Sequence, residues 1–341
     1  MNRKGIKTIG SAAAMSLIMS TLPAAVAKAA PGQVTQVGGA DSYETASKVA
    51  TTNWTSSDNV ILVCGEGYAD SVSAAVLSKQ LKAPILLTQS QSLNSNAKSA
   101  LDTLKPKNIY IIGGTSSVSQ SIRNTLKSEN YNLIELGGKD RYETNAAVAK
   151  KLVELGADSS NAIMVGGGGF SDALSAASIA AAKGEILLLG NNDETAMKPV
   201  LDFVKDKNSN VTVIGTQNTV NDKVYKDVNA VKRVNGGADR FETNLNVLGA
   251  FSGDLKSDKM YIANADGTRY QDALIAASLA GINSSPLVLL SGQGNTQTQN
   301  ALSYIKSNAK KTTDLNLISE NGVVSDGSIS DINSAVSEYD N

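Results

Sequence analysis

The sequence predicts an α/β protein of three tandem units, each built on a parallel sheet of the Rossmann or flavodoxin type. Two observations predict this fold. The same landmarks occur three times in the same order, and short apolar runs alternate with helical segments of about 10–15 residues. The apolar runs show no polar alternation, which is typical of strands covered on both faces, and helices between such strands favour a parallel sheet with right-handed crossovers.

The repeat is clearest in a Gly-Gly-x-Asp motif that carries a glutamate three residues after the aspartate. It spans residues 38–45, 137–144 and 236–243, so the aspartate moves by 99 residues each time. Three further landmarks keep step with it: residues 69–71, 171–173 and 271–273; residues 84–87, 185–188 and 286–289; residues 109–113, 211–215 and 315–319. We therefore divide the chain into a leader, residues 1–29, and domain-sized units at 30–130, 131–229 and 230–341.

The second unit shows the expected order of elements. We expect strands at 133–136, 162–165, 186–189 and 211–214, with helices at 141–155, 172–182, 194–205 and near 222–230. The third unit is expected to end with a helix near 328–339. The helix from Asp172 and its counterpart from Asp272 consist almost wholly of small residues, which permit a close approach. Such a helix either packs unit against unit around a pseudo-threefold centre or packs within its own unit.

The leader has the features of a cleaved signal peptide. Arg3, Lys4 and Lys7 precede an apolar stretch over residues 9–26, and the residues 27–29 form an Ala-x-Ala cleavage site. Polar residues dilute the stretch and no basic cluster follows it, which argues against a membrane helix. The remainder contains no other segment apolar enough to span a bilayer. These features predict a secreted protein.

Composition excludes several classes of function. The net charge is −1, and without the four basic residues of the leader 27 basic residues face 32 acidic ones, which disfavours a broad nucleic-acid interface. The chain has no histidine, the commonest general base and zinc ligand, so we expect no metal site and no cofactor. The single cysteine, Cys64, cannot form an internal disulfide, and its apolar neighbours predict a buried thiol.

The paired carboxylates of the Gly-Gly-x-Asp motif are interpreted as helix caps. An aspartate before a helix with a glutamate three residues later is close to a capping box, in which both side chains accept backbone N–H groups. The predicted caps are Asp41 with Glu44, Asp140 with Glu143, and Asp239 with Glu242.

Capping does not require the arginine and the aromatic residue inside the motif. Arg141, Tyr142, Arg240 and Phe241 could therefore contact a ligand or pair with carboxylates of the neighbouring unit, whereas the first unit carries Ser42 in place of the arginine.

Residues 166–169, four consecutive glycines before a helix, resemble a phosphate-binding loop. They match neither the dinucleotide fingerprint nor the Walker pattern, so we interpret them as a tight turn. Aromatic residues are few, with Trp54 the only tryptophan. If the protein binds a glycan, hydrogen bonds in clefts between units are expected to carry much of the recognition.

The motif at 137–144 and its relatives, the Ser-Asp-Ala-Leu-Ser-Ala segment at 171–176 and the Pro-Ile-Leu-Leu strand at 84–87 together resemble the cell wall-binding repeat 2 family of clostridial surface proteins. The resemblance spans essentially the whole chain after the leader. It implies three Rossmann-like domains packed as a pseudo-trimer that bind an anionic secondary cell-wall polymer without covalent linkage. It also implies, by position, a polymer-binding role for Pro84, Ile85, Leu86 and Leu87; unit 2 departs from this segment with Gly184-Glu185.

An acidic protein that binds an acidic polymer needs local cationic pockets, for which Arg141, Arg240, Arg233 and Lys139 are candidates. Members of the family usually add an effector region, and none is expected here after the third unit. The protein is then a wall-coating module, similar to the anchoring subunit of some S-layers, or a partner such as another surface-layer protein supplies an activity.

Two other classes of function stay open. A hydrolase could use the carboxylates at 140–143 and 239–242, although the capping spacing and the threefold repetition argue against it. An extracellular solute-binding receptor could close on a small ligand, although such receptors are not built from three equal units. The leading prediction is a non-catalytic wall-binding protein.

Overall fold

The computed structural model describes residues 28–291 and 294–337. The predicted signal peptide lies outside the described residues except for its last two positions. No helix in the described ranges has both the length and the apolar character needed to cross a bilayer.

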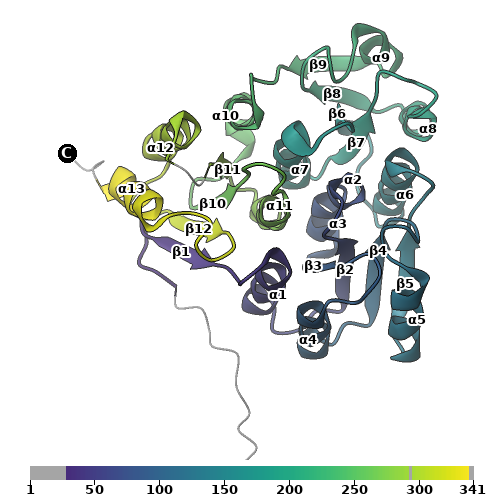
Figure 1. Cartoon of the computed structure of the whole chain (residues 1–341). Coiled ribbons are helices and arrows are strands. Elements are labelled where there is room, and N and C mark those ends of the chain that lie inside the picture. The colour runs from purple at the N-terminus through teal and green to yellow at the C-terminus, as the bar shows by residue number, and fades with distance from the viewer. Residues whose placement is uncertain (1–27, 292–293, 338–341) are drawn as a thin grey trace, which may run out of the picture.

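Three four-stranded parallel sheets form the framework, as predicted (Figure 1). The strand orders are β3-β2-β4-β5, β7-β6-β8-β9 and β11-β10-β12-β1. The strands are β1 (Val34–Val37), β2 (Asn59–Cys64), β3 (Ile85–Thr88), β4 (Asn108–Ile112), β5 (Asn132–Leu136), β6 (Asn161–Gly166), β7 (Ile186–Gly190), β8 (Asn210–Ile214), β9 (Ala230–Val234), β10 (Lys259–Asn264), β11 (Leu287–Leu290) and β12 (Asp314–Ile318).

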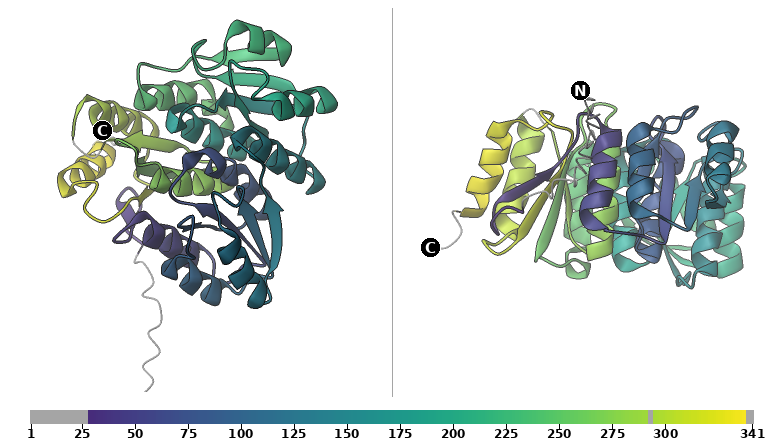
Figure 2. Two further views of the ribbon diagram at one scale, coloured as in Figure 1. Left: turned by 45° about the vertical axis from the view of Figure 1, so that its right-hand side comes forward. Right: turned by 90° about the horizontal axis from the view of Figure 1, so that it is seen from below.

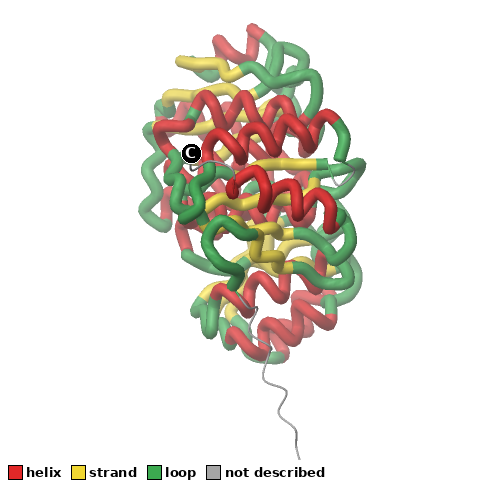
Figure 3. Tube along the Cα trace, turned by 90° about the vertical axis from the view of Figure 1, so that its left-hand side faces the viewer, coloured by secondary structure: helices red, strands yellow, loops and turns green. Residues whose placement is uncertain are grey.

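Helices lie on both sides of the strands (Figure 3). They are α1 (Ser42–Asn53), α2 (Tyr68–Ser71), α3 (Ala74–Leu81), α4 (Ser95–Leu104), α5 (Gln120–Ser128), α6 (Arg141–Glu154), α7 (Phe170–Lys183), α8 (Lys198–Lys207), α9 (Asp222–Asp227), α10 (Arg240–Ala250), α11 (Gln271–Asn283), α12 (Thr296–Asn308) and α13 (Asp326–Ser337), with a short 3-10 helix at Ser252–Asp254. Beyond their first residues the central strands β2, β4, β6 and β10 are buried, which explains their apolar sequences.

Each repeat gives its first strand to the sheet of the preceding unit. β5, at the start of the second repeat, pairs with β4, and β9 pairs with β8 in the same way. The expectation that residues 133–136 belong to the sheet of unit 2 was therefore wrong. The first strand of the chain, β1, pairs with β12 of the third unit and so closes the assembly into a ring (Figures 1 and 2).

Two predicted helices of unit 2 have different bounds. A helix expected from residue 194 begins as α8 at Lys198, where Pro199 occupies the first turn, a position that proline favours because its missing N–H has no partner there. A helix expected to reach residue 230 ends at Asp227, because Asn229 adopts positive φ and Ala230 begins β9.

The helices rich in small residues meet at the centre of the molecule. α3, α7 and α11 pack on one another, and each also packs on a strand of its own unit, so both interpretations of these helices hold. The approach is closest between α7 and α11, where a Cβ at Gly281 would lie 2.3 Å from the Cβ of Ala181. The prediction of three α/β domains packed as a pseudo-trimer is confirmed.

Candidate functional site

The aspartates and glutamates of the Gly-Gly-x-Asp motif lie at the starts of α1, α6 and α10. Asp140 accepts hydrogen bonds from the main-chain N–H groups of Tyr142 and Glu143, at 2.8 and 2.9 Å. Glu143 reaches back and accepts from the N–H of Lys139 at 2.9 Å. The equivalent pairs, Asp41 with Glu44 and Asp239 with Glu242, bind backbone amides in the same way. These carboxylates are engaged by the backbone and do not converge on a reactive centre.

The second glycine of the motif is required by the capping glutamate. A Cβ at Gly138 would lie 2.1 Å from the Cβ of Glu143, and the corresponding separations at Gly39 and Gly237 are 2.5 and 2.4 Å. The motif therefore encodes a tight strand-to-helix connection.

The cap yields a direct prediction for stability. Replacing Asp140 by alanine removes the acceptor of two amides, and we expect the free energy of unfolding to fall by about 1 kcal/mol. Asp140→Asn keeps a side-chain acceptor and is expected to lose less. Thermal melts followed by circular dichroism compare the two variants, and equal losses would contradict the capping role.

Arg141 joins the second unit to the first. Its Nη1 donates to the main-chain oxygen of Gly167 at 2.5 Å and to the hydroxyl oxygen of Tyr68 at 2.6 Å. Arg240 repeats this role: it donates to the main-chain oxygens of Ala265 and Gly267 and lies over the ring of Phe170, 4.4 Å from its centroid. The neighbouring unit thus supplies an aromatic ring to each arginine, and not the carboxylate considered from the sequence.

The three aromatic residues of these contacts form a cluster at the pseudo-threefold centre. The rings of Tyr68, Phe170 and Tyr270 lie 5.7 to 6.2 Å apart in all three pairs. Tyr270 faces the unit that carries Ser42 in place of an arginine, and here its hydroxyl and the amide of Gln271 donate to the main-chain oxygen of Gly65. The first unit lacks this arginine, and there the equivalent contact is made by Tyr270 and Gln271 of the third unit.

A buried asparagine directly after the motif also bridges two units. Nδ2 of Asn145 donates to Oγ of Ser73 at 3.0 Å and to the main-chain oxygen of Leu187 at 2.9 Å, while its Oδ1 accepts from the N–H of Leu189 at 2.9 Å. Asn244 makes the equivalent bonds to Ser175, Leu287 and Leu289. The sequence analysis missed these residues, although their constant place after the threonine of the motif was a usable signal.

The remaining candidates are mostly buried or engaged. The segment Pro84–Leu87 is buried in the first unit. Arg233 donates to the main-chain oxygens of Gly215 and Val220, at 3.0 and 2.8 Å. In the first unit these two carbonyls correspond to Gly113 and Val118, which accept from Arg123 of helix α5 instead. Of the cationic candidates, Lys139 is the one whose side chain is largely exposed.

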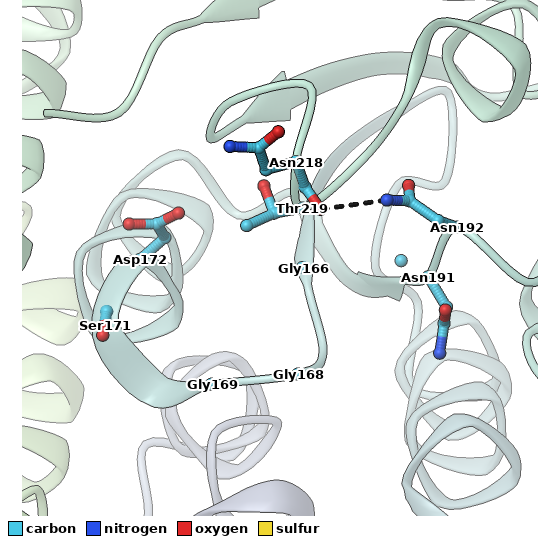
Figure 4. Close-up of a pocket in the computed structure, with 10 residues that line it drawn as sticks. Gly166, Gly168, Gly169, Ser171, Asp172, Asn191, Asn192, Asn218 and Thr219 are labelled. Atoms are coloured by element: carbon cyan, nitrogen blue, oxygen red, sulfur yellow. Dashed lines mark hydrogen bonds between the residues drawn. The ribbon is translucent and has the colours of Figure 1, made fainter. Parts of the chain in front are cut away.

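A pocket of about 270 Å³ opens at the carboxyl ends of β6 and β7 and beside the loop after β8 (Figure 4). It is lined by Gly166, Gly168, Gly169, Ser171, Asp172, Gly190, Asn191, Asn192, Asn218 and Thr219. β6 lies between β7 and β8, so the chain reverses its direction of winding here, and such switch points are where open α/β sheets bind ligands. The glycine turn predicted at 166–169 forms one wall of this pocket.

Arg141 and Tyr142 hold opposite walls of the pocket. Arg141 binds the oxygen of Gly167 in the glycine turn, and the hydroxyl of Tyr142 accepts from Nδ2 of Asn191 at 2.6 Å. Asn192 donates to the main-chain oxygen of Asn218 at 2.9 Å, which fixes the third wall. The lining offers amides, hydroxyls and one carboxylate, and it contains no cationic side chain.

The carboxylate at this position differs among the units. Asp70 accepts from Oγ of Ser117 at 2.6 Å, whereas burial raises the pKa of Asp172. Asp272 is 8% exposed; its Oδ2 accepts from the N–H of Glu320 at 2.7 Å, and its Oδ1 has no partner among the described residues. Burial, followed by the nearby charge of Glu320, raises the pKa of Asp272 to about 7. The described residues hold no group of three or more potential metal ligands.

Fold and site define a class: a ring of three α/β units whose repeated motifs serve the joints between units and whose open pocket is polar. A match to the family described as Cell wall binding domain 2 covers residues 36–123, 135–225 and 234–329, and the chain belongs to this family. The resemblance noted from the sequence is confirmed. Membership supports attachment to the cell wall and a location at the cell surface.

Two of the relatives in sequence are proteins of Bacillus subtilis (strain 168). The chain is 31% identical to the N-acetylmuramoyl-L-alanine amidase LytC over 265 residues, which are 77% of this chain and 51% of LytC. It is 35% identical to the Amidase enhancer over 256 residues, 74% of this chain and 34% of that protein. The chain therefore spans about half or less of these relatives.

Solved structures share the whole assembly. Cwp6 from Clostridium difficile has a TM-score of 0.79 and 28% identity, over 93% of this chain and 50% of Cwp6. Cwp8 from the same organism has a TM-score of 0.78 and 26% identity, over 90% of this chain and 52% of Cwp8. The three-unit arrangement is thus common to this chain and to clostridial proteins.

Proposed function

We propose that this protein is secreted and attaches non-covalently, without turnover, to a Gram-positive cell wall by binding an anionic secondary wall polymer. Membership of the wall-binding family supports attachment, and the pocket at the carboxyl ends of β6 and β7 is the observation that carries the proposal. A surface-coat or S-layer component that contacts other surface proteins is the biological setting that fits this activity.

The chemistry of the pocket fits a sugar residue of such a polymer. Amide and hydroxyl groups can donate to and accept from sugar hydroxyls, and Ser171 and Asn218 offer side chains at the rim. A volume of about 270 Å³ is close to the lower end of the usual range for ligand pockets. Asp172 disfavours a phosphate at this point, because its carboxylate would repel it.

This site changes the roles proposed for the candidate residues. We propose that Arg141 and Tyr142 position the pocket walls and do not themselves grip the polymer. Arg240 and Phe241 occupy the equivalent places in the third unit. Because Pro84–Leu87 is buried, we propose that this segment contributes through the loop that follows Thr88.

Co-sedimentation with purified walls tests the proposal. We expect the protein to be retained on intact walls and released from walls stripped of their anionic polymer. The double variant Ser171→Ala/Asn218→Ala removes two rim groups and should lower the affinity for walls about thirtyfold, since each hydrogen bond contributes roughly 1 kcal/mol. Asn246→Ala, on the exposed face of α10, is the matched control and should bind normally.

The same assay separates attachment from catalysis. We expect no new reducing ends or amines in the wall supernatant, because the carboxylates of the motif bind backbone amides. If such products are released and Glu143→Gln abolishes their release, the protein is a hydrolase and the proposed function is wrong. Equal retention on stripped and intact walls would reject polymer binding.

A further inference from the structure

A second pocket lies between the first and third units, at the opposite end of the sheets. It is formed where α1, α3 and α11 end, and in a parallel α/β unit these helix ends lie near the amino ends of the strands (Figure 1). Its volume is about 270 Å³. The lining residues are Asn53, Trp54, Lys79, Lys82, Leu279, Ile282 and Asn283.

Trp54, the only tryptophan of the chain, forms an aromatic wall of this pocket. It caps the end of α1 and is partly exposed. Its Nε1 donates to the main-chain oxygen of Lys82 at 2.8 Å, which fixes the orientation of the indole. A fixed and partly exposed indole offers a flat apolar surface at low conformational cost.

Two lysines, Lys79 and Lys82, line the pocket together with the indole. Nζ of Lys79 crosses to the third unit and donates to the main-chain oxygen of Ile282 at 2.9 Å. Lys82 is exposed and adopts a left-handed conformation, with φ of 51°, at the end of α3. Burial lowers the pKa of Lys79, and the charges of Lys256 and Lys82 lower it further. In the described ranges none of these three lysines has a carboxylate oxygen within 4.0 Å of its Nζ.

The pseudo-symmetry of the ring provides an internal comparison. Between the third and second units, Phe251 takes the place of Trp54, and Nζ of Lys183 lies 5.7 Å from its ring centroid. There the lysine is neutralised by Asp254 at 3.0 Å and Glu185 at 3.4 Å. Between the second and first units, Leu155 takes this place and its oxygen accepts from the amide of Gln80. The pocket at Trp54 thus combines an aromatic wall with uncompensated lysines.

We infer that this pocket binds an anionic saccharide, with the sugar ring stacked on Trp54 and its phosphate or carboxylate paired with Lys82 and Lys79. The site would supply the cationic contact that the pocket in the second unit lacks, and in this respect it rests on the proposed function. Asn53 and Asn283 stand at the rim and can hydrogen-bond the sugar hydroxyls. An ammonium–phosphate or ammonium–carboxylate bond is about twice as strong as a neutral one.

Fluorescence of the single tryptophan reports on this pocket alone. The protein is titrated with glucose 6-phosphate, glucuronate, glucose and inorganic phosphate at constant ionic strength. We expect saturable changes in emission with glucose 6-phosphate, glucuronate or both. The sugar that acts shows whether the pocket accepts a phosphate, a carboxylate or either group. Glucose and inorganic phosphate should act only at concentrations at least about tenfold higher, because each lacks half of the contacts.

Variants of two similar lysines provide the control. Lys82→Gln should weaken binding of the anionic sugar about tenfold or more. Lys105→Gln should have no effect, because Lys105 is also an exposed, left-handed residue at a helix end, with φ of 50°, but lies at α4. Both substitutions are on the surface, and unchanged melting temperatures will show that the fold is intact.

Three results would overturn the inference: an unchanged titration with Lys82→Gln, a glucose response equal to that of glucose 6-phosphate, or an inorganic phosphate response equal to it. The wall assay tests the proposed function separately from this titration. Selective titration at Trp54 together with equal retention on stripped and intact walls would refute the proposed binding of the wall polymer and leave this saccharide site standing.

Discussion

Asn145→Ala is expected to lower the free energy of unfolding by roughly 3 kcal/mol. The substitution removes three buried hydrogen bonds, to Ser73, Leu187 and Leu189. Two of these partners are main-chain groups of β7, an edge strand that depends on side chains or solvent to satisfy its free groups. Left without Asn145, they stay buried and unpaired, which costs more than the bonds themselves contribute.

Chemical denaturation with urea measures this loss. Asn244→Ala should behave alike, because Asn244 has the equivalent partners in the third unit. Ser73→Ala removes only the bond between units and should cost about 1 kcal/mol, and a double-mutant cycle with Asn145→Ala isolates that bond. The first unit carries Ala46 at this position, so polar bridging is not needed at every joint. A loss below about 0.5 kcal/mol, the size expected of a surface change, would contradict the bridging role.

The fold of each unit could be predicted from the sequence, but the exchange of strands between units could not. Strand and helix assignment depends on local patterns, and the apolar run at 133–136 looks the same whether it joins the sheet before it or after it. The choice is made by packing: β5 completes the edge beside β4, while helix α6, only a few residues later, packs on β7. The closure of the ring by β1 pairs residues nearly 300 positions apart, as Val34 with Leu315, which no local pattern encodes.

Residues with a fixed local geometry were the predictable part of the site. The spacing of Asp140 and Glu143 implies a cap because both side chains act within one helical turn. The destinations of the arginines were not predictable, because a long side chain can bond to any element within reach. Arg123 and Arg233 show this: they bond to equivalent carbonyls, yet one is on a helix and the other on a strand. The low aromatic content likewise gave no indication that Trp54 lies beside lysines of another element.

The second large effect concerns pH and the buried carboxyl of Asp272. Burial and the charge of Glu320 raise its pKa from an ordinary value of 3.8 to about 7; Arg269 and Asp41 are the other charged groups that act on it. Between these two pH values the folded protein holds a proton that the unfolded chain has released. Stability contributed by this proton is therefore fully present below about pH 4 and is lost as the pH rises to about 7. The difference of about three pKa units corresponds to as much as 4 kcal/mol.

Asp272→Asn tests this linkage, because an amide has no charge to bury. We expect the variant to lose the fall in unfolding free energy between pH 4 and 7 that Asp272 causes in the natural protein, and to exceed it in stability at about pH 8. Its carbonyl can keep the bond from the N–H of Glu320, and its unpaired N–H₂ group reduces the gain at high pH. Asp331→Asn, an exposed change on α13, should leave the pH profile as it is. Parallel profiles for the natural protein and Asp272→Asn would mean that the carboxyl of Asp272 ionises in the folded state without penalty, and so that water reaches its unpaired Oδ1.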